Sequence, residues 1–186
     1  MNHRKPITLA ALAFAANLSV MAAHADSGIY IGGGAGKTNM QDSAGNPGGV
    51  QFDESSAALK LFAGYHLDFI PLLKFAAEVG YRDLGRPTSS QGGVDVEYRA
   101  NGFDYGVMAG LGLGPVDLFG RVGGMNYRLQ KIVGGTRSDF DGTAPVYGLG
   151  VWFTLFGVGI RAEYEKIDMK ELDNAHMLSA SAFYQF

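Results

Sequence analysis

The sequence predicts an all-β fold, an eight-stranded antiparallel up-and-down β-barrel that crosses a bacterial outer membrane. Three observations lead to this prediction. The chain begins with an export signal, apolar residues alternate with polar or glycine residues through the rest of it, and its last residue is an aromatic, Phe186. Together they indicate the compartment, the surrounding solvent and the fold class.

The N-terminal segment has the parts of a secretory signal. Arg4 and Lys5 form a short basic region, and residues 7–16 form an apolar stretch too short to cross a bilayer. Residues 23–25 (Ala-His-Ala) supply the small side chains that a signal peptidase requires. We therefore expect residues 1–25 to be a cleaved signal peptide and residues 26–186 to be one transmembrane β-barrel domain.

The composition excludes several classes of protein. Acidic residues outnumber basic ones by 18 to 15, and loss of two cations with the signal widens the difference, so nucleic acid is not an expected partner. The chain has no cysteine, so no disulfide can stabilise it. Beyond the signal no apolar run reaches the roughly 18 residues of a transmembrane helix. A closed barrel is the other structure that pairs every backbone group inside a bilayer.

Eight strands with alternating apolar residues are expected along the mature chain. They cover residues 28–37, 57–67, 72–84, 98–111, 116–129, 146–155, 158–167 and 175–186. The turns on the periplasmic side are short, at 68–71, 112–115 and 156–157, whereas the connections on the other side, over 38–56, 85–97 and 128–145, are long and rich in Gly, Ser, Asn and Asp. This asymmetry is typical of outer-membrane barrels.

Charged residues set the orientation of each strand, because an Arg or Lys on the lipid face at mid-bilayer costs about 2–4 kcal/mol. In the strand over residues 72–84 this rule places Glu78 and Arg82 in the lumen and leaves Val79 and Tyr81 for lipid. We expect the inward charges to pair with one another, since an unpaired charge in a narrow interior costs several kcal/mol. The expected lumen network consists of Lys60, Glu78, Arg82, Asp104, Arg121, Arg161, Glu163 and Glu165.

Several short motifs are similar to those of a known family. They are residues 62–65 (FAGY), 78–81 (EVGY), 84–86 (LGR), 116–125 (VDLFGRVGGM), 161–164 (RAEY), 177–179 (MLS) and 184–186 (YQF). With these motifs the mature chain resembles the transmembrane barrel of the outer membrane protein A family and, more loosely, the opacity-type surface barrels. A lumen pair of that family corresponds to Glu78 and Arg161 here. Their strands also lie on opposite walls of a closed ring of eight.

The resemblance also shows where this chain departs from the family. The positions of a second lumen pair hold Gly110 and Trp152, so we do not expect a gate that swaps partners between two pairs. Family members often carry a C-terminal peptidoglycan-binding domain, which we do not expect here because the sequence ends at the last strand. Phe186 resembles the C-terminal signal that barrel-assembly machinery reads on unfolded clients.

Loop residues supply candidates for partner contacts. Arg128, Lys131 and Arg137 are candidates for contact with lipopolysaccharide phosphates, because guanidinium groups pair with phosphate in a bidentate manner. Two groups of carboxylates, one near Asp139 and one near Glu171, could hold calcium, but neither has a full set of oxygen ligands at a recognised spacing. We therefore expect neither a metal site nor a cofactor.

We predict a monomeric integral outer-membrane protein with a structural and surface-interaction role and no catalytic activity. Its expected partners are outer-membrane lipids, lipopolysaccharide, the barrel-assembly machinery and surface molecules that the loops contact. One alternative is a narrow pore gated by the lumen charges, which would conduct ions. Another is a lipid A-modifying enzyme, which would change the mass of lipid A. Such an enzyme needs a nucleophile beside a base, but His176 and Ser179 fall on opposite faces of one strand.

Overall fold

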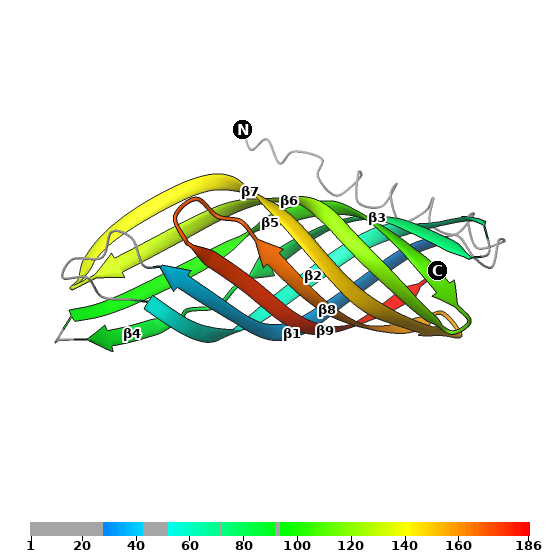
Figure 1. Cartoon of the computed structure of the whole chain (residues 1–186), viewed down its shortest axis with the longest axis horizontal. Coiled ribbons are helices and arrows are strands. Elements are labelled where there is room, and N and C mark those ends of the chain that lie inside the picture. Colours follow the sequence, from blue (N-terminus) through cyan, green and yellow to red (C-terminus); the bar gives the residue numbers. More distant parts are fainter. Residues whose placement is uncertain (1–27, 43–51, 71, 92–93) are drawn as a thin grey trace, which may run out of the picture.

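The computed structural model describes residues 28–42, 52–70, 72–91 and 94–186, and the expected signal peptide lies outside this part of the chain. These residues form one antiparallel sheet (Figure 1). Its strands are β1 (Gly28–Asp42), β2 (Phe52–Ile70), β3 (Leu73–Asp83), β4 (Thr88–Gln91), β5 (Val94–Leu113), β6 (Val116–Val133), β7 (Thr136–Leu155), β8 (Val158–Ile167) and β9 (Asn174–Gln185). A helix that could cross a membrane does not occur among the described residues.

The sheet closes into a ring of eight. Except for β3 and β4, strands that follow one another in the chain pair with each other, and β1 pairs with β9 to complete the circle. Strands β3 and β4 form one wall together, because both pair with β5 and only residues 84–87 separate them. Gly85 in this break has a φ of 81°, a conformation that glycine adopts without a steric penalty. The predicted all-β, eight-stranded antiparallel barrel is therefore confirmed.

The strands are longer on the extracellular side than expected. The prediction of a long irregular connection over residues 128–145 is wrong. Strands β6 and β7 pair through this segment, and only Gly134 and Gly135 join them. Both glycines have positive φ, 54° and 83°, as two-residue hairpin turns require. Parts of 38–56 and 85–97 are also strand. The hairpin projects beyond the β8–β9 connection in Figure 1. Its outward residues are polar because it stands above the bilayer, so the alternation used to find strands is lost there.

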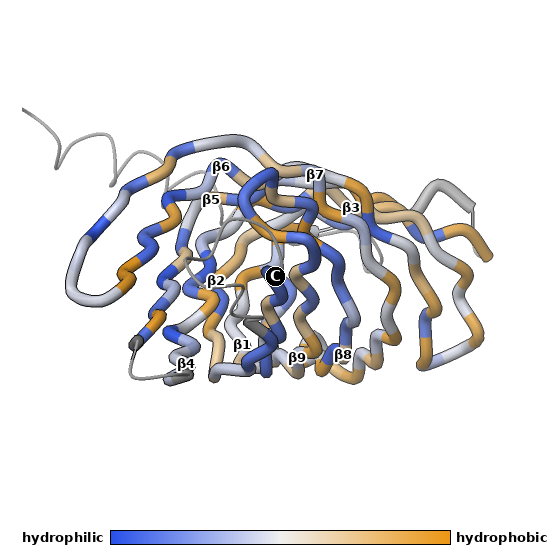
Figure 2. The backbone as a smooth tube through the Cα atoms, turned by 60° about the vertical axis from the view of Figure 1, so that its left-hand side comes forward, coloured by the Kyte–Doolittle hydropathy of each residue, from blue (hydrophilic) through white to orange (hydrophobic). Residues whose placement is uncertain are grey.

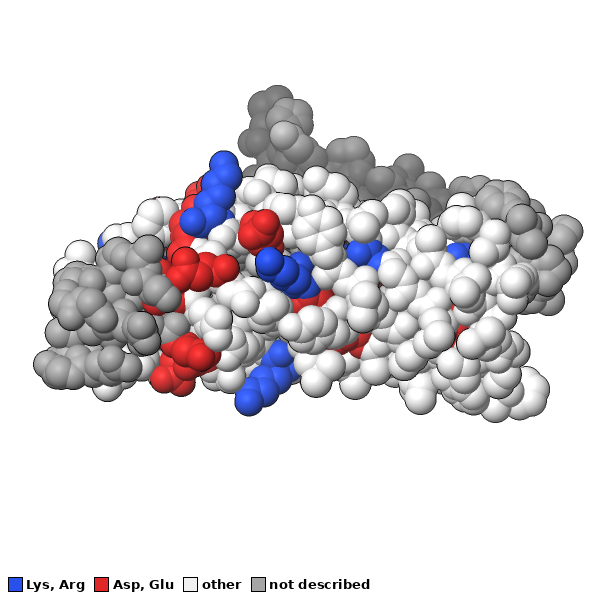
Figure 3. All heavy atoms as spheres, viewed as in Figure 1, with Lys and Arg blue, Asp and Glu red and all other residues white. Residues whose placement is uncertain are grey.

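The outward side chains of the eight walls form a continuous apolar band. Along β5 it runs from Leu113 to Phe103, which at a tilt of about 45° spans about 25 Å, the height of a bilayer's hydrocarbon core. The first polar outward residues above the band are Lys37 (β1), Ser55 (β2), Asp83 (β3), Asn101 (β5), Asn126 (β6), Thr143 (β7), Lys166 (β8) and His176 (β9). Polar and apolar positions alternate along the strands in Figure 2, and in Figure 3 the charged surface atoms gather toward the extracellular end.

Buried side chains fill the described lumen in three layers. Near the periplasmic turns lies an aromatic plug, which consists of Tyr30, Phe62, Ala76, Met108, Phe119, Trp152 and Phe183. Near the extracellular end lies an apolar plug, which consists of Met40, Ala58, Leu84, Val96, Tyr98, Ala100, Met125, Tyr127, Leu129, Ala144, Val146, Ile167, Met169, Leu172, Ala175 and Met177. The charges lie between the plugs. On β2, for example, Lys60 stands between Ala58 of one plug and Phe62 of the other.

The charge network in the lumen

The structure brings together all eight charged residues that the sequence places in the lumen, and we call them the charge network. They come from five walls of the barrel: Lys60 from β2, Glu78 and Arg82 from β3, Asp104 from β5, Arg121 from β6, and Arg161, Glu163 and Glu165 from β8. Each is at most 4% exposed. Four cations face four anions, so the network is neutral as a whole.

Glu78 is the centre of one half of the network. Its Oε2 accepts a hydrogen bond from Arg161 Nη1 at 2.7 Å and another from the Tyr30 hydroxyl at 3.0 Å. Its Oε1 accepts from Arg121 Nη1. The bond between Glu78 and Arg161 crosses the barrel from β3 to the opposite wall, β8. The pairing implied by the family resemblance is therefore present in this structure.

Glu165 is the centre of the other half. Its Oε1 accepts from Arg82 Nη2 at 3.1 Å and lies 3.5 Å from Arg121 Nε, while Lys60 Nζ is 3.3 Å from its Oε2. Asp104 Oδ2 accepts from Arg82 Nη2 at 2.7 Å and also from Arg121. Because Arg121 contacts carboxylates of both halves, the network is continuous. Every described charge in it has an opposite charge within bonding distance.

Glu163 joins the two halves along β8. It accepts from Lys60 Nζ and lies 3.0 Å from Arg161 Nε. The alternation of β8 places Arg161, Glu163 and Glu165 on one face, where they stand as successive rungs inside the barrel. In a charge-balanced chain of this kind, loss of any one partner would leave an uncompensated buried charge, which is strongly destabilising.

The aromatic plug encloses the network on the periplasmic side. The Arg161 guanidinium lies 4.1 Å from the centroid of the Phe62 ring and 5.6 Å from that of Trp152. Trp152 stacks on the His66 ring at 4.3 Å and meets Phe183 edge-on at 5.3 Å. The family's second lumen pair is thus replaced by a packed aromatic cluster. Sequence reasoning missed this plug, although its signal was present as aromatic residues at the inward positions just below the charges.

Two tyrosines above the membrane tie the apolar plug to nearby carboxylates. The Tyr98 hydroxyl donates to Asp42, and the Tyr127 hydroxyl donates to Glu171 in the β8–β9 connection. Burial and the neighbouring carboxylate raise the pKa of Tyr127 to about 12, and the same two causes raise the pKa of Tyr98 well above its ordinary value. These contacts hold the extracellular end of the lumen closed.

The three candidate lipopolysaccharide contacts are each engaged by a carboxylate of the chain. Arg128 Nε is 3.1 Å from Asp141 Oδ1, and Arg137 Nε is 2.9 Å from the Oδ1 of Asp139, on the exposed face of the β6–β7 hairpin. Lys131 faces inward and is 17% exposed, with its Nζ 3.0 Å from an Asp42 oxygen and 5.3 Å from the centre of the Tyr98 ring. Contact of these cations with lipopolysaccharide stays a prediction.

Two remaining candidates, the assembly signal Phe186 and the histidine of the enzyme alternative, His176, lie on the outside of the barrel wall. The backbone N–H of Phe186 donates to the carbonyl of Ile29 at 2.9 Å, and its ring is half exposed toward lipid. On β9, His176 faces outward with its Nδ1 3.0 Å from the Tyr164 hydroxyl, whereas Ser179 is buried inside. The histidine and the serine are therefore on opposite faces of the wall.

The whole barrel corresponds to a known family of proteins. The family model described as "Outer membrane protein beta-barrel domain" matches residues 7–186. The chain belongs to this family. It is an outer-membrane β-barrel, as the apolar band and the filled lumen require.

Solved barrels of the same shape share little sequence with this chain. It is similar to Neisserial surface protein A (17% identity, TM-score 0.60, 88% of this chain and 100% of that one) and to Ail of Yersinia pestis (16%, 0.59, 87% and 100%). The N-terminal barrel of OprF from Pseudomonas aeruginosa is also similar (10%, 0.52, 87% and 100%). At these identities the similarity shows the fold alone. No curated protein matches the chain.

Proposed function

We propose that this protein is a structural and surface-interaction element of the outer membrane whose barrel is a closed plug. The observation that carries this proposal is the three-layered filling of the lumen. An ion that crossed the barrel would have to pass two apolar clusters and to separate the paired charges between them. Separating one buried pair costs about 3–5 kcal/mol, so a continuous aqueous path is unfavourable.

The test is a planar-bilayer recording of the purified, folded protein, with a general porin as the positive control. We expect no discrete conductance steps. Steps that appear in the native protein and disappear in Glu78→Ala or Arg161→Ala would overturn the proposal and establish a gated pore.

The positions of the candidate base and nucleophile, His176 and Ser179, do not support a catalytic role. His176 and Ser179 lie on opposite faces, and the near neighbour of His176 is the Tyr164 hydroxyl at 3.0 Å. This separation supports a role that does not include modification of lipid A. Incubation with lipopolysaccharide should leave the mass of lipid A unchanged. A new mass that His176→Ala abolishes would contradict this.

The surface role is assigned to the hairpin and strand ends that rise above the band. We call residues 94–100, 127–133 and 136–142 the extracellular extension. Its outward cations are neutralised within the chain, since Arg128 and Arg137 are paired and Arg99 Nη2 is 3.5 Å from Glu97. Such a mixed surface favours a polar protein or glycan partner over a polyanion.

A polyanion is nevertheless a useful probe, because the solved Ail barrel is a complex with the heparin analogue sucrose octasulfate. We expect the extension of this chain to bind that compound weakly at physiological salt, and Arg128→Gln to leave the binding unchanged. Tight binding that Arg128→Gln weakens would assign the extension to polyanions instead.

A further inference from the structure

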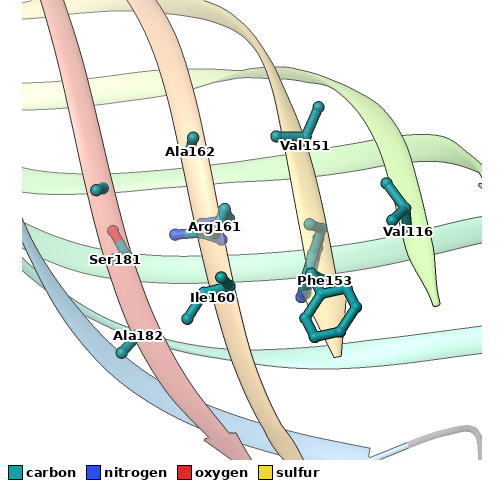
Figure 4. Close-up of a pocket in the computed structure, with 10 residues that line it drawn as sticks. Val116, Val151, Phe153, Ile160, Arg161, Ala162, Ser181 and Ala182 are labelled. Carbon is teal, nitrogen blue, oxygen red and sulfur yellow. The ribbon is translucent and has the colours of Figure 1, made fainter. Parts of the chain in front are cut away.

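Strands β7 and β8 separate near the top of the apolar band. Their last pair in register is Val146 with Ile167, and β7 continues beyond it through residues 136–145. Figure 4 shows the closed part of this seam near the periplasmic end, where Val151 of β7 lies beside Ala162 of β8. Higher up, β6 remains paired with one side of residues 136–145, and no described strand pairs with the other side. We call this segment the β7 edge.

The base of the β7 edge shows which backbone groups face its open side. The carbonyl of Pro145 accepts a hydrogen bond from the backbone N–H of Asp168 at 3.0 Å, so it points to the β8 side. In an antiparallel ladder, alternate residues direct their N–H and C=O groups to the same side. The residues whose groups point to the open side are therefore Arg137, Asp139, Asp141 and Thr143. The groups of the residues between them point to β6.

The β7 edge is long, regular and exposed. Proteins usually protect such a strand with a proline, a bulge or a covering segment. Residues 136–144 include no proline, their pairing with β6 continues without a bulge, and residues 136–141 are all exposed. In Figure 1 this segment of β7 (yellow) forms the margin of the projecting hairpin. A row of free donors and acceptors on an exposed strand is a template for an added strand.

The β7 edge does not fit a second copy of the chain in the same membrane. Strands of outer-membrane barrels tilt by about 35–45°, so two copies related by a twofold axis along the membrane normal would bring these edges together at about 70–90°. Paired strands lie within about 35° of each other. The occupant that fits the edge is therefore an extended segment of another polypeptide.

The side chains of the β7 edge select the pattern of that segment. Asp139 and Asp141 point outward, and the side chain of Asp141 is 70% exposed. Between them Phe140 points to the inner face and is 38% exposed. On the β6 side the residue opposite Asp141 is already a cation, Arg128, and opposite charges directly across two strands stabilise their pairing. A segment with basic residues opposite the two aspartates and an apolar residue opposite Phe140 would repeat this arrangement on the open side.

We propose that the β7 edge binds an extended segment of a partner protein as an additional antiparallel strand, and that this segment alternates basic and apolar residues. The backbone of the segment would pair with Arg137, Asp139, Asp141 and Thr143. Its basic side chains would lie beside the two aspartates on the outward face. This inference rests on the surface role proposed for the extracellular extension, and it specifies the conformation and the chemistry of the partner. It does not depend on whether the lumen conducts.

The experiment measures amide hydrogen exchange by NMR on the full barrel folded in zwitterionic micelles. The probe is a peptide of alternating lysine and valine, blocked at both ends. In the free protein the amides of Ser138 and Phe140 should be protected by β6, whereas those of Arg137, Asp139 and Asp141 should exchange rapidly. Bound peptide should slow exchange of the second group by about tenfold or more and leave the first group unchanged. Attraction between charges alone would not produce this alternation.

Two variants of Asp139 separate the backbone contact from the charge. Asp139→Pro removes an N–H from the open side and leaves the pairing with β6, as proline at the solvent-facing side of an edge strand does. It should weaken peptide binding by about tenfold or more. The matched control, Asp139→Ala, removes the same charge but keeps the N–H, and should weaken binding by at most about fivefold. Folding of each variant is checked by heat-dependent gel mobility.

Modified peptides test the same contact on the native protein, independently of how Asp139→Pro folds. Methylation of the lysine amides removes the donors that face the β7 edge and should weaken binding by about tenfold or more, whereas methylation of the valine amides, which face away, should have little effect. A peptide of alternating glutamate and valine should bind about tenfold more weakly than the lysine peptide.

The proposal is overturned if the two methylated peptides bind equally, if a folded Asp139→Pro binds as well as Asp139→Ala, or if the glutamate peptide binds as tightly as the lysine peptide. Binding of the lysine peptide without alternating protection would also overturn strand addition. That last result would leave the proposed surface role intact, because the peptide would then bind the protein in another way.

Discussion

Replacement of Glu78 by Gln removes one negative charge from the centre of the charge network and keeps the shape of the side chain. Arg161 and Arg121 each lose a partner but retain another, since Arg161 Nε is 3.0 Å from Glu163 and Arg121 Nε is 3.5 Å from Glu165. Breaking a buried pair costs about 3–5 kcal/mol, and the retained partners place this change at the lower end, about 3 kcal/mol. The equilibrium constant for unfolding should therefore rise roughly 150-fold.

The assay is reversible urea unfolding of the barrel in lipid vesicles, followed by tryptophan fluorescence. The chain has one tryptophan, Trp152, and it lies in the aromatic plug beside the Arg161 guanidinium. The control is Glu97→Gln, whose pair with Arg99 is about a third exposed and should contribute less than about 0.5 kcal/mol. Addition of Arg161→Met to Glu78→Gln restores neutrality, so the double variant should be more stable than the sum of the single losses by about 1 kcal/mol or more. Strict additivity, or a Glu78→Gln variant as stable as the Glu97→Gln control, would refute the view that the network acts as one unit.

Three further outcomes are expected. Gly159→Ala should cost about 1–3 kcal/mol of unfolding free energy, because a Cβ there would overlap the Phe183 ring. The control is Gly120→Ala, which should cost little because its Cβ would meet nothing closer than 3.9 Å. Equal urea midpoints for the two variants would contradict this packing. The pKa of Tyr127 is about 12 in the folded protein and 10.0 in the unfolded chain. The stability that this difference contributes is therefore present below pH 10 and lost as the pH rises toward 12. Tyr127→Phe should remove this part of the pH dependence in unfolding titrations. Deletion of Phe186 should lower the amount of assembled barrel in cells more than the yield of refolding in micelles; equal losses would indicate a packing role in place of an assembly signal.

The orientation of each strand could be predicted from the sequence because one physical cost dominates inside a bilayer. A charge on the lipid face is so unfavourable that Lys60, Glu78 and Arg161 each fix the register of their strand. The same reasoning identified the members of the charge network. It could not assign most of the partners, because a side chain such as Arg121 contacts carboxylates from two other walls, and those distances depend on the closed ring.

Other features could not be found in this way. Above the bilayer the outward residues are polar, so the rule that located the strands no longer applied to the β6–β7 hairpin. Its sequence signal was the Gly134-Gly135 pair, which was assigned to a long loop. The aromatic plug was missed because Trp152 was considered only as a departure from the family's second lumen pair.

The pairing of β1 with β9 has a consequence for how the molecule forms. These are the first and last strands of the described chain, and their register runs from Tyr30 opposite Gln185 to Gln41 opposite Asn174. Such contacts have the greatest separation along the chain that this protein allows, and their loop-closure entropy makes them slow to form. Until they do, both margins of the curved sheet offer unsatisfied backbone groups to any other strand. Ring closure is therefore expected to be the late, rate-limiting event of maturation, and the interval before it is when the nascent barrel is most exposed to misassociation.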